Sequence, residues 1–263
     1  MIEYHAKHAE TSNFIEKSDS IFRDVHIITI ADYSKFVYNL QANQRGDKHM
    51  KFDAVIFDFD GTVADTGEGV RNAVRYALNE YKMPIYEERL NEFLGPPLYI
   101  TFERMYGVSP ELASDIVDTY RVYYADRGVH ECKAYDGILD LASDLKEAGV
   151  KLAIASSKPL VFLEIGVRET GAGKHIEEVV GPELKNHEAN KAYLVRAACE
   201  RLGIEPSKRV AMIGDRFYDI DGANEVGVTS IGVEYGFGHR EEFEDHNADY
   251  IATTVDDLRK ILL

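Results

Sequence analysis

Residues 54–62 read Ala-Val-Ile-Phe-Asp-Phe-Asp-Gly-Thr and carry the strongest signal in the chain. An apolar run ends directly at Asp58, and Asp60 follows one position further on. Side chains alternate along a strand, so both carboxylates can approach the same side where the strand ends. Two carboxylates held together at the tip of a buried strand are costly, which favours a chemical role, although a strand that runs into an Asp-Gly turn is itself common.

From residue 52 onward the chain alternates apolar strands with amphipathic helices. Apolar residues at helical spacing predict a helix over 138–148, which Gly149 ends. Continuous apolar strands separated by such helices predict an α/β fold with a parallel sheet that helices cover on both faces. Ligands of such sheets collect at the carboxyl ends of the strands. The predicted strands are 54–58, 150–155, 178–181, 210–214, 228–233 and 250–252.

Residues 66–136 interrupt this alternation and look helical throughout. Gly-Pro-Pro at 95–97 and Gly107 separate the expected helices at 70–81, 89–93, 98–106 and 110–124. We therefore expect an all-α subdomain, with tyrosines packed in its core, inserted into a domain made of 50–65 and 137–263. Residues 1–49 form an extension of unknown role, with an expected strand at 25–30 and a helix at 32–41. Its four histidines show no metal-ligand spacing.

The composition excludes several classes of partner. The chain has 263 residues, 45% hydrophobic content and a formal net charge of −16. This charge argues against a nucleic acid polymer or an anionic membrane as a partner. Cys132 and Cys199 are too few for a disulfide framework or a thiolate metal cluster. With no membrane-length apolar run and no signal-peptide pattern, we expect a cytoplasmic protein, as a monomer or homodimer.

Polar side chains occur at four points, each at the carboxyl end of a predicted strand or at the start of the next helix. These are Asp58, Asp60 and Thr62, then Ser156, Ser157 and Lys158, then Lys191 behind the helix cap Asn190, and finally Asp215 and Asp219. Together they suit phosphoryl transfer. Mg²⁺ held by oxygen ligands would neutralise the repulsion between a carboxylate nucleophile and a phosphate ester. The expected ligands are Asp58, Asp215, the main-chain carbonyl of Asp60 and, through bound water, Asp219.

The remaining roles follow from the same chemistry. Asp58 would form an aspartyl-phosphate, and Asp60 would protonate the leaving alcohol and then activate water. Hydroxyl, ammonium and backbone N–H groups would bind the phosphate oxygens that are not transferred. The expected phosphate-binding residues are Phe59, Thr62, Ser156, Ser157 and Lys191.

With these four regions in order from about residue 52 to the end, the chain resembles the haloacid dehalogenase superfamily of phosphatases. The resemblance implies a Rossmann-like core, Mg²⁺ as cofactor and a small phosphorylated metabolite as substrate. It implies Asp58 as nucleophile, Asp60 as acid/base, Ser156 as the hydroxyl of the second region, Lys191 rather than Lys158 as the lysine of the third, and Asp215 and Asp219 as metal-binding acids.

Spacing narrows the resemblance. The 98 positions from Asp58 to Ser156 accommodate a helical cap, whereas the 35 from Ser156 to Lys191 are too few for a second cap domain. This arrangement resembles the phosphoglycolate-phosphatase-like branch. Within it, residues 95–98, 155–159 and 235–238 resemble the group labelled 5′-nucleotidase-like. Residues 182–190 depart from the lysine-proline stretch of many relatives.

We therefore expect Mg²⁺-dependent hydrolysis of a phosphomonoester such as phosphoglycolate, a nucleoside monophosphate or a sugar phosphate. Two alternatives stay open: a phosphomutase that shares Asp58 and Asp60, and a regulatory or binding protein that acts through residues 1–49. Dehalogenation is disfavoured, because Asp60 supplies a proton donor that halide loss does not need. Residues that select the substrate are expected in the cap, near 95–98 or Arg104.

Overall fold

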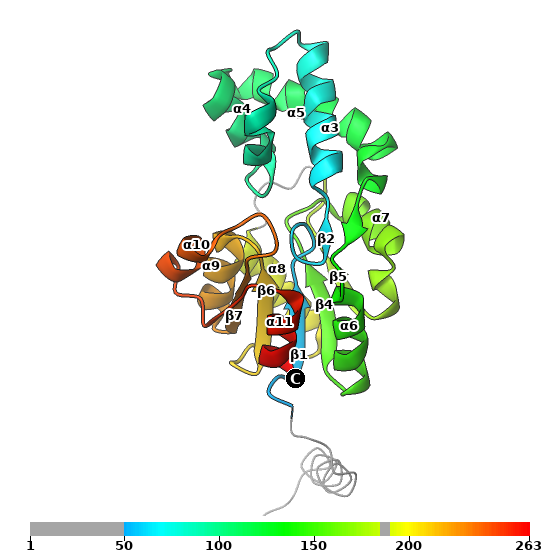
Figure 1. Cartoon of the computed structure of the whole chain (residues 1–263), viewed down its shortest axis with the longest axis vertical. Coiled ribbons are helices and arrows are strands. Elements are labelled where there is room, and N and C mark those ends of the chain that lie inside the picture. The colour runs from blue at the N-terminus through cyan, green and yellow to red at the C-terminus, as the bar shows by residue number, and fades with distance from the viewer. Residues whose placement is uncertain (1–49, 185–189) are drawn as a thin grey trace, which may run out of the picture. The chain divides into compact units, whose positions relative to one another are not determined.

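The computed structural model describes residues 50–184 and 190–263 (Figure 1). The strand and the helix expected within 1–49 lie outside these residues. Six parallel strands form the main sheet in the order β5-β4-β1-β6-β7-β8, which confirms the predicted parallel α/β sheet. They are β1 (Ala54–Phe57), β4 (Lys151–Ala155), β5 (Glu178–Val180), β6 (Val210–Gly214), β7 (Thr229–Val233) and β8 (Tyr250–Ala252).

The central strand β1 shows why this sequence makes a two-faced sheet. Its four residues are all buried, and they alternate between two separate hydrophobic clusters. Val55 and Phe57 belong to the cluster on one face, whereas Ala54 and Ile56 belong to the cluster on the other. Because a strand that is buried on both faces has no polar side, its sequence is continuously apolar up to Asp58.

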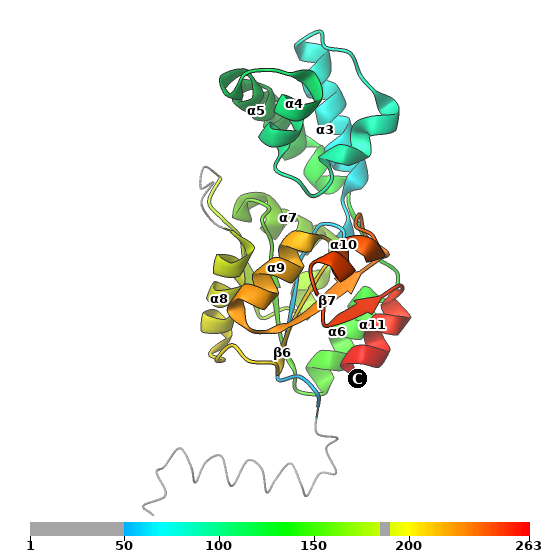
Figure 2. The same ribbon diagram turned by 90° about the vertical axis from the view of Figure 1, so that its left-hand side faces the viewer.

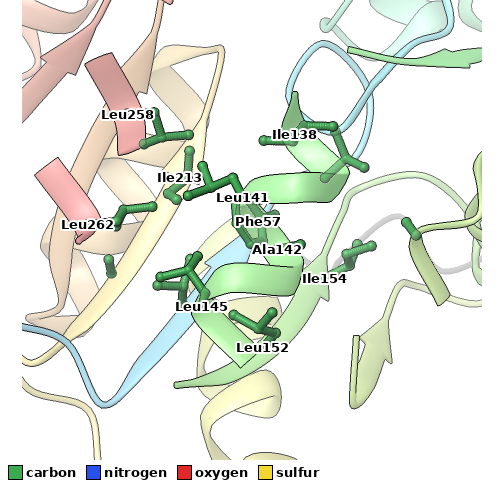
Figure 3. Packing of buried hydrophobic residues seen from close by; sticks show 14 of the residues in the cluster. Phe57, Ile138, Leu141, Ala142, Leu145, Leu152, Ile154, Ile213, Leu258 and Leu262 are labelled. Atoms are coloured by element: carbon green, nitrogen blue, oxygen red, sulfur yellow. The ribbon is translucent and has the colours of Figure 1, made fainter. Parts of the chain in front are cut away.

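Helices cover both faces, as Figure 2 shows from the side. One face packs against α6 (Ile138–Glu147), α7 (Leu160–Thr170) and α11 (Val255–Leu262). Leu141 and Leu145 of α6 meet Leu258 and Leu262 of α11 over the sheet (Figure 3). The other face packs against α8 (Lys191–Leu202) and α9 (Phe217–Val226), and α10 (Arg240–Asp245) follows β7.

A separate helical bundle lies at one end of the sheet (Figure 1). It consists of α3 (Gly67–Glu80), a 3₁₀ helix at Glu87–Phe93, α4 (Leu98–Tyr106) and α5 (Pro110–Asp126), and a short 3₁₀ turn at Gly128–His130 follows. Ser109 caps α5 by accepting a bond from the Leu112 N–H. Phe93 and Phe102 are buried in its own core, with ring centroids 4.7 Å apart.

One part of the predicted helical stretch was wrong. Lys133–Ala134 is a strand, β3, which pairs antiparallel with β2 at Ala64–Asp65. The two connections into and out of the bundle run side by side here, so their backbone groups satisfy one another. Pairs of this length show no periodicity, which is why the sequence pattern did not reveal them. Among the described residues, no helix combines the length and the apolarity needed to cross a membrane.

Candidate active site

The carboxyl ends of β1, β4 and β6 converge on one cavity of about 560 Å³. Strand β1 ends one residue before Asp58, β4 one residue before Ser156 and β6 one residue before Asp215. The three strands are adjacent and parallel in register, so these residues meet at one edge. Residues from all four predicted regions line the cavity, namely Asp58, Asp60, Ser156, Ser157, Lys158, Lys191, Asp215 and Asp219.

Three buried carboxylates form the centre of this site. Asp58, Asp215 and Asp219 each place a carboxylate oxygen within 4.8 Å of the others. Burial first, and then the charges of Asp219 and Asp58, raise the pKa of Asp215 well above its ordinary value. Burial likewise raises the pKa of Asp219 to about 6, although Lys191 opposes the rise. The cluster therefore resists ionisation unless a cation neutralises it.

Lys191 lies inside this cluster. Its Nζ is 3.0 Å from Oδ1 of Asp58 and 2.7 Å from Oδ1 of Asp219, and it donates to the carbonyl of Ala155 at 3.1 Å. Burial would lower the pKa of this ammonium, but Asp219 and Asp58 raise it above its ordinary value. Lys191 is the first residue of α8, and the predicted cap is confirmed because Asn190 accepts from the Tyr193 N–H.

Asp215 keeps an unsatisfied oxygen. Its Oδ2 accepts a bond from the Phe237 N–H at 2.8 Å, whereas its buried Oδ1 has no hydrogen-bond partner in the described part of the chain. The Oδ2 atom of Asp219 accepts from the Arg216 N–H at 3.0 Å. A buried carboxylate oxygen without a donor, next to two further carboxylates, is a donor set suited to a hard cation such as Mg²⁺.

Two glycines allow the acids to approach so closely. Gly61 has φ of +77°, and a Cβ at this position would overlap the carboxylate of Asp215. A Cβ on Gly214 would overlap the side chain of Asp219. A side chain at either position would push the carboxylates apart, so the two Asp-containing turns need glycine for steric reasons.

Asp60 lies beside this cluster and has its own lysine. Lys158 Nζ is 2.8 Å from Oδ1 and 2.9 Å from Oδ2 of Asp60. Burial would lower the pKa of Lys158, but the charge of Asp60 raises it above its ordinary value. The sequence ranked Lys158 below Lys191 for a single lysine role, whereas the structure places both lysines at the site with different partners. The signal for Lys158 was its place directly after β4, two residues beyond Ser156.

Two predicted phosphate-binding residues do not line the cavity. Thr62 is fully buried, its hydroxyl has no partner among the described residues, and its carbonyl accepts from the Tyr235 hydroxyl at 3.1 Å. The ring of Phe59 packs in the hydrophobic core, while its carbonyl accepts from three N–H groups of the following turn. A role of Phe59 can therefore involve its backbone N–H, as the sequence suggested, but not its side chain.

The helical bundle supplies cavity residues that the sequence did not identify. Val117, Tyr120 and Tyr124 of α5 line the cavity, as do Phe93 and Leu94. The sequence shows only that these residues recur at helical spacing. Residues that pack the core of the bundle have the same spacing, so the pattern does not distinguish them from residues of the cavity wall. The structure shows that Val117, Tyr120 and Tyr124 belong both to that core and to the cavity wall.

Hydrogen bonds of Arg216 connect the core to the bundle. The Arg216 Nε donates to Glu242 at 3.0 Å, and its Nη1 donates to the carbonyl of Leu94 at 2.7 Å. Arg216 immediately follows Asp215, so one short loop both carries an acid of the cluster and contacts the bundle. Arg104, which the sequence suggested for substrate selection, is not among the residues that line the cavity. It pairs instead with Glu92 at 3.2 Å.

Comparisons with known proteins agree with this geometry. A 5′-nucleotidase from Pseudomonas aeruginosa is 34% identical over 219 residues, which are 82% of this chain and 98% of that protein. Tyrosine-protein kinase PtkA from Mycobacterium tuberculosis is 35% identical over 212 residues, which are 79% of this chain and 72% of that protein.

The fold comparison gives the same result. The crystal structure of a predicted phosphatase from Clostridium acetobutylicum matches with a TM-score of 0.75 and 39% identity, over 80% of this chain and 97% of that chain. The family model for haloacid dehalogenase-like hydrolases matches residues 55–233, which confirms the resemblance seen in the sequence. The chain therefore belongs to the haloacid dehalogenase-like hydrolase family.

Proposed function

We propose that this protein is a Mg²⁺-dependent phosphatase that hydrolyses a small phosphomonoester through a phosphorylated Asp58. The charge balance of the acid cluster carries this proposal. Asp58, Asp215 and Asp219 bring three carboxylates together, and Lys191 supplies one ammonium. The two negative charges in excess match one divalent cation, and the partnerless Oδ1 of Asp215 offers a ligand.

The carboxylates of Asp58 and Asp215, with the carbonyl of Asp60, would hold Mg²⁺ directly, and Asp219 would hold it through a bound water. Bound Mg²⁺ supplies positive charge that reduces the repulsion between the phosphate dianion and the Asp58 carboxylate. Such help is needed because each cationic side chain that lines the cavity in the described part of the chain already has an acidic partner. The pairs are Arg121–Asp118, Lys158–Asp60, Lys191–Asp58, Lys191–Asp219 and Arg216–Glu242.

Each step of the proposed reaction is assigned to particular residues of the chain. An Asp58 carboxylate oxygen attacks phosphorus while the bond from phosphorus to the leaving oxygen breaks. Asp60, which has to enter this step protonated, gives its proton to that oxygen. Water next attacks the aspartyl-phosphate, Asp60 takes a proton from it, and inorganic phosphate leaves with Asp58 restored. Lys191 and the hydroxyl of Ser156 would hold the phosphate oxygens that are not transferred.

The cavity wall favours an uncharged leaving group with an apolar or planar face, and we assign the helical bundle as the cap that encloses it. The bundle contributes Val117, Tyr120 and Phe93 to this wall. A carboxylate on the leaving group, as in phosphoglycolate, would have to compete with Asp118, Asp60 or Glu242 for a cation. A nucleoside has no such charge, and similarity to a 5′-nucleotidase supports this choice.

Phosphate release from a panel of substrates tests the proposal. We expect turnover of nucleoside 5′-monophosphates with Mg²⁺, little turnover of phosphoglycolate, and no turnover with EDTA. Asp58→Asn should be folded and inert, with a loss of at least about 10⁴-fold. No phosphate release from any monoester, or Mg²⁺-dependent turnover by Asp58→Asn, would overturn the proposal.

Phosphoryl transfer to an acceptor other than water is the second candidate. Similarity to a protein whose name is tyrosine-protein kinase PtkA is the observation that supports this second candidate. A mutase would use the same Asp58 and Asp60 but return the phosphoryl group to a sugar. Two results would favour this candidate, each without a matching release of phosphate. One is the conversion of a sugar phosphate to its isomer, and the other is the labelling of a tyrosine peptide.

A further inference from the structure

Lys158 is the point at which the bundle contacts the acid/base side of the site. On the core side, its ammonium is within 2.9 Å of both oxygens of Asp60. On the other side, the ring of Tyr124 lies 4.8 Å from Nζ. Tyr124 comes from α5 of the bundle, whereas Lys158 and Asp60 follow strands of the core. The ammonium is thus enclosed between a carboxylate of the core and an aromatic face of the bundle.

Tyr124 is itself held firmly in place. Its ring stacks on Tyr120 with a centroid distance of 5.3 Å and an interplanar angle of 12°. Phe162 of α7 meets it edge-on at 5.5 Å. Both tyrosines are at least nine-tenths buried. Because Tyr124 is a residue of α5 and its ring is closely packed, the position of the ring follows the position of α5 over the core.

The Lys158 ammonium is held in one position between Asp60 and the ring of Tyr124. The side chain of Lys158 is only 7% exposed, so water cannot replace its partners. A cation there is stabilised by the carboxylate and by the ring face, and it loses the ring face if the bundle moves away from the core. Because Nζ contacts both oxygens of Asp60, the direction of that carboxylate depends on where Lys158 is held.

We propose that Lys158 is a positioning residue that directs Asp60 toward the leaving oxygen, and that Tyr124 couples this position to the bundle. The proposal rests on the proposed function, in which Asp60 protonates the leaving group. Lys191 serves the acid cluster and Lys158 serves Asp60, so the two lysines affect different parts of the reaction. A misplaced donor costs most where the leaving oxygen is most basic, because such an oxygen depends most on receiving a proton.

The test is a series of substituted phenyl phosphates whose phenols differ in acidity. For Lys158→Met we expect kcat/KM to fall less than about tenfold with the most acidic phenol and about 10²-fold with the least acidic one. A plot of log kcat/KM against phenol pKa therefore becomes steeper than in the wild type. A merely structural defect would instead lower kcat/KM equally for all phenols and leave the slope of the plot unchanged. Lys158→Arg, which keeps the charge, should restore most of the wild-type slope.

Lys151→Met is the matched control. Lys151 is the first residue of β4, the strand that precedes Lys158, and its Nζ donates to the carbonyl of Leu202 at 2.6 Å. This variant should keep the wild-type slope. A parallel shift for Lys158→Met, or an equal change of slope for Lys151→Met, would overturn the positioning role while leaving the phosphatase proposal intact. A wild-type protein without activity on any phosphate ester would instead overturn the phosphatase proposal itself.

Tyr124→Leu tests the coupling to the bundle. Removing the ring should lower kcat/KM about threefold more for the least acidic phenol than for the most acidic one. This is roughly the effect of losing one cation–π contact. Tyr123→Leu is the control, since Tyr123 precedes it on α5 but contacts Glu131 at 3.1 Å. An unchanged slope in a folded Tyr124→Leu protein would show that Lys158 acts without the bundle and would overturn the coupling.

Discussion

The edge of the sheet and the helical bundle contribute opposite kinds of surface to one cavity. The sheet edge brings carboxylate oxygens of Asp58, Asp215 and Asp219 within 4.8 Å of one another. Lys191 lies within ion-pair distance of Asp58 and Asp219, and two glycine positions tolerate no side chain. The bundle brings mostly apolar and aromatic groups, and Arg121, the one cation that its described residues place at the cavity, is already paired. From this difference we expect the transfer of the phosphoryl group and the choice of leaving group to depend on different regions. Substitutions in the acid cluster and at Lys191 should affect all substrates alike, whereas those in the cavity wall of the bundle should discriminate by the size of the leaving group.

Lys191→Met should give the largest effect, and it should be uniform. We expect kcat/KM to fall about 10²- to 10³-fold on every substrate, since a buried charge aimed at the phosphate is lost. Removing one partner of a buried pair also leaves carboxylates uncompensated, so unfolding should require about 3–5 kcal/mol less. Steady-state kinetics and urea unfolding measure the two losses.

Lys208→Met is the control for Lys191→Met. Lys208 pairs with Asp249 at 2.7 Å, but its side chain is 60% exposed. Exposed pairs contribute little, so this variant should keep its activity and most of its stability. A Lys191→Met protein whose losses differed greatly between substrates would contradict the separation of chemistry from selection.

Val117→Phe should give a smaller and selective effect. Val117 is 6% exposed and lines the cavity from α5, so a larger side chain reduces the space for the leaving group. We expect kcat/KM for a nucleoside monophosphate to fall about tenfold and that for methyl phosphate to stay within about twofold. Val122→Phe lies on the same helix at a position that is 62% exposed, and it should change neither value. Equal losses on both substrates would contradict a role of Val117 in selecting the leaving group.

The third effect is on stability and not on activity, because bound Mg²⁺ should stabilise the folded protein. At about 100 times its Kd, a ligand adds about 2.7 kcal/mol, which raises Tm by roughly 5–10 °C for a domain of this size. The pKa of Asp219 is raised to about 6, so without metal the cost of ionising this buried group is fully present above pH 6. The increase in Tm should therefore be greatest above that pH and should shrink toward pH 5, where Mg²⁺ has to displace a proton.

Asp215→Asn provides the comparison for the metal effect. It removes one proposed ligand and one repelling charge together, so this variant should be more stable without metal and should gain little from Mg²⁺ at any pH. A gain as large as in the wild type would mean that Mg²⁺ binds elsewhere. Differential scanning fluorimetry with and without Mg²⁺ at several pH values measures both proteins.

The sequence was informative where one strand and its following turn hold both the pattern and the chemistry. Asp58, Ser156 and Asp215 could be placed at one edge because each follows an apolar strand, and parallel strands end together. The pairing of Lys158 with Asp60 could not be derived, since it depends on the direction of two side chains from different strands. The wall residues Val117 and Tyr120 could not be separated from core residues, because a helix face that packs inward has the same spacing in both cases.

The account depends most on Asp58 as the residue that receives the phosphoryl group. Turnover can be stopped with acid at millisecond intervals, and the digested protein can be analysed by mass spectrometry for phosphate on the peptide that contains Asp58. We predict phosphate on Asp58 within the first turnover, its loss as substrate is consumed, and none in Asp58→Asn. Rapid turnover with an unmodified protein at every time, or phosphate on another residue, would contradict the account.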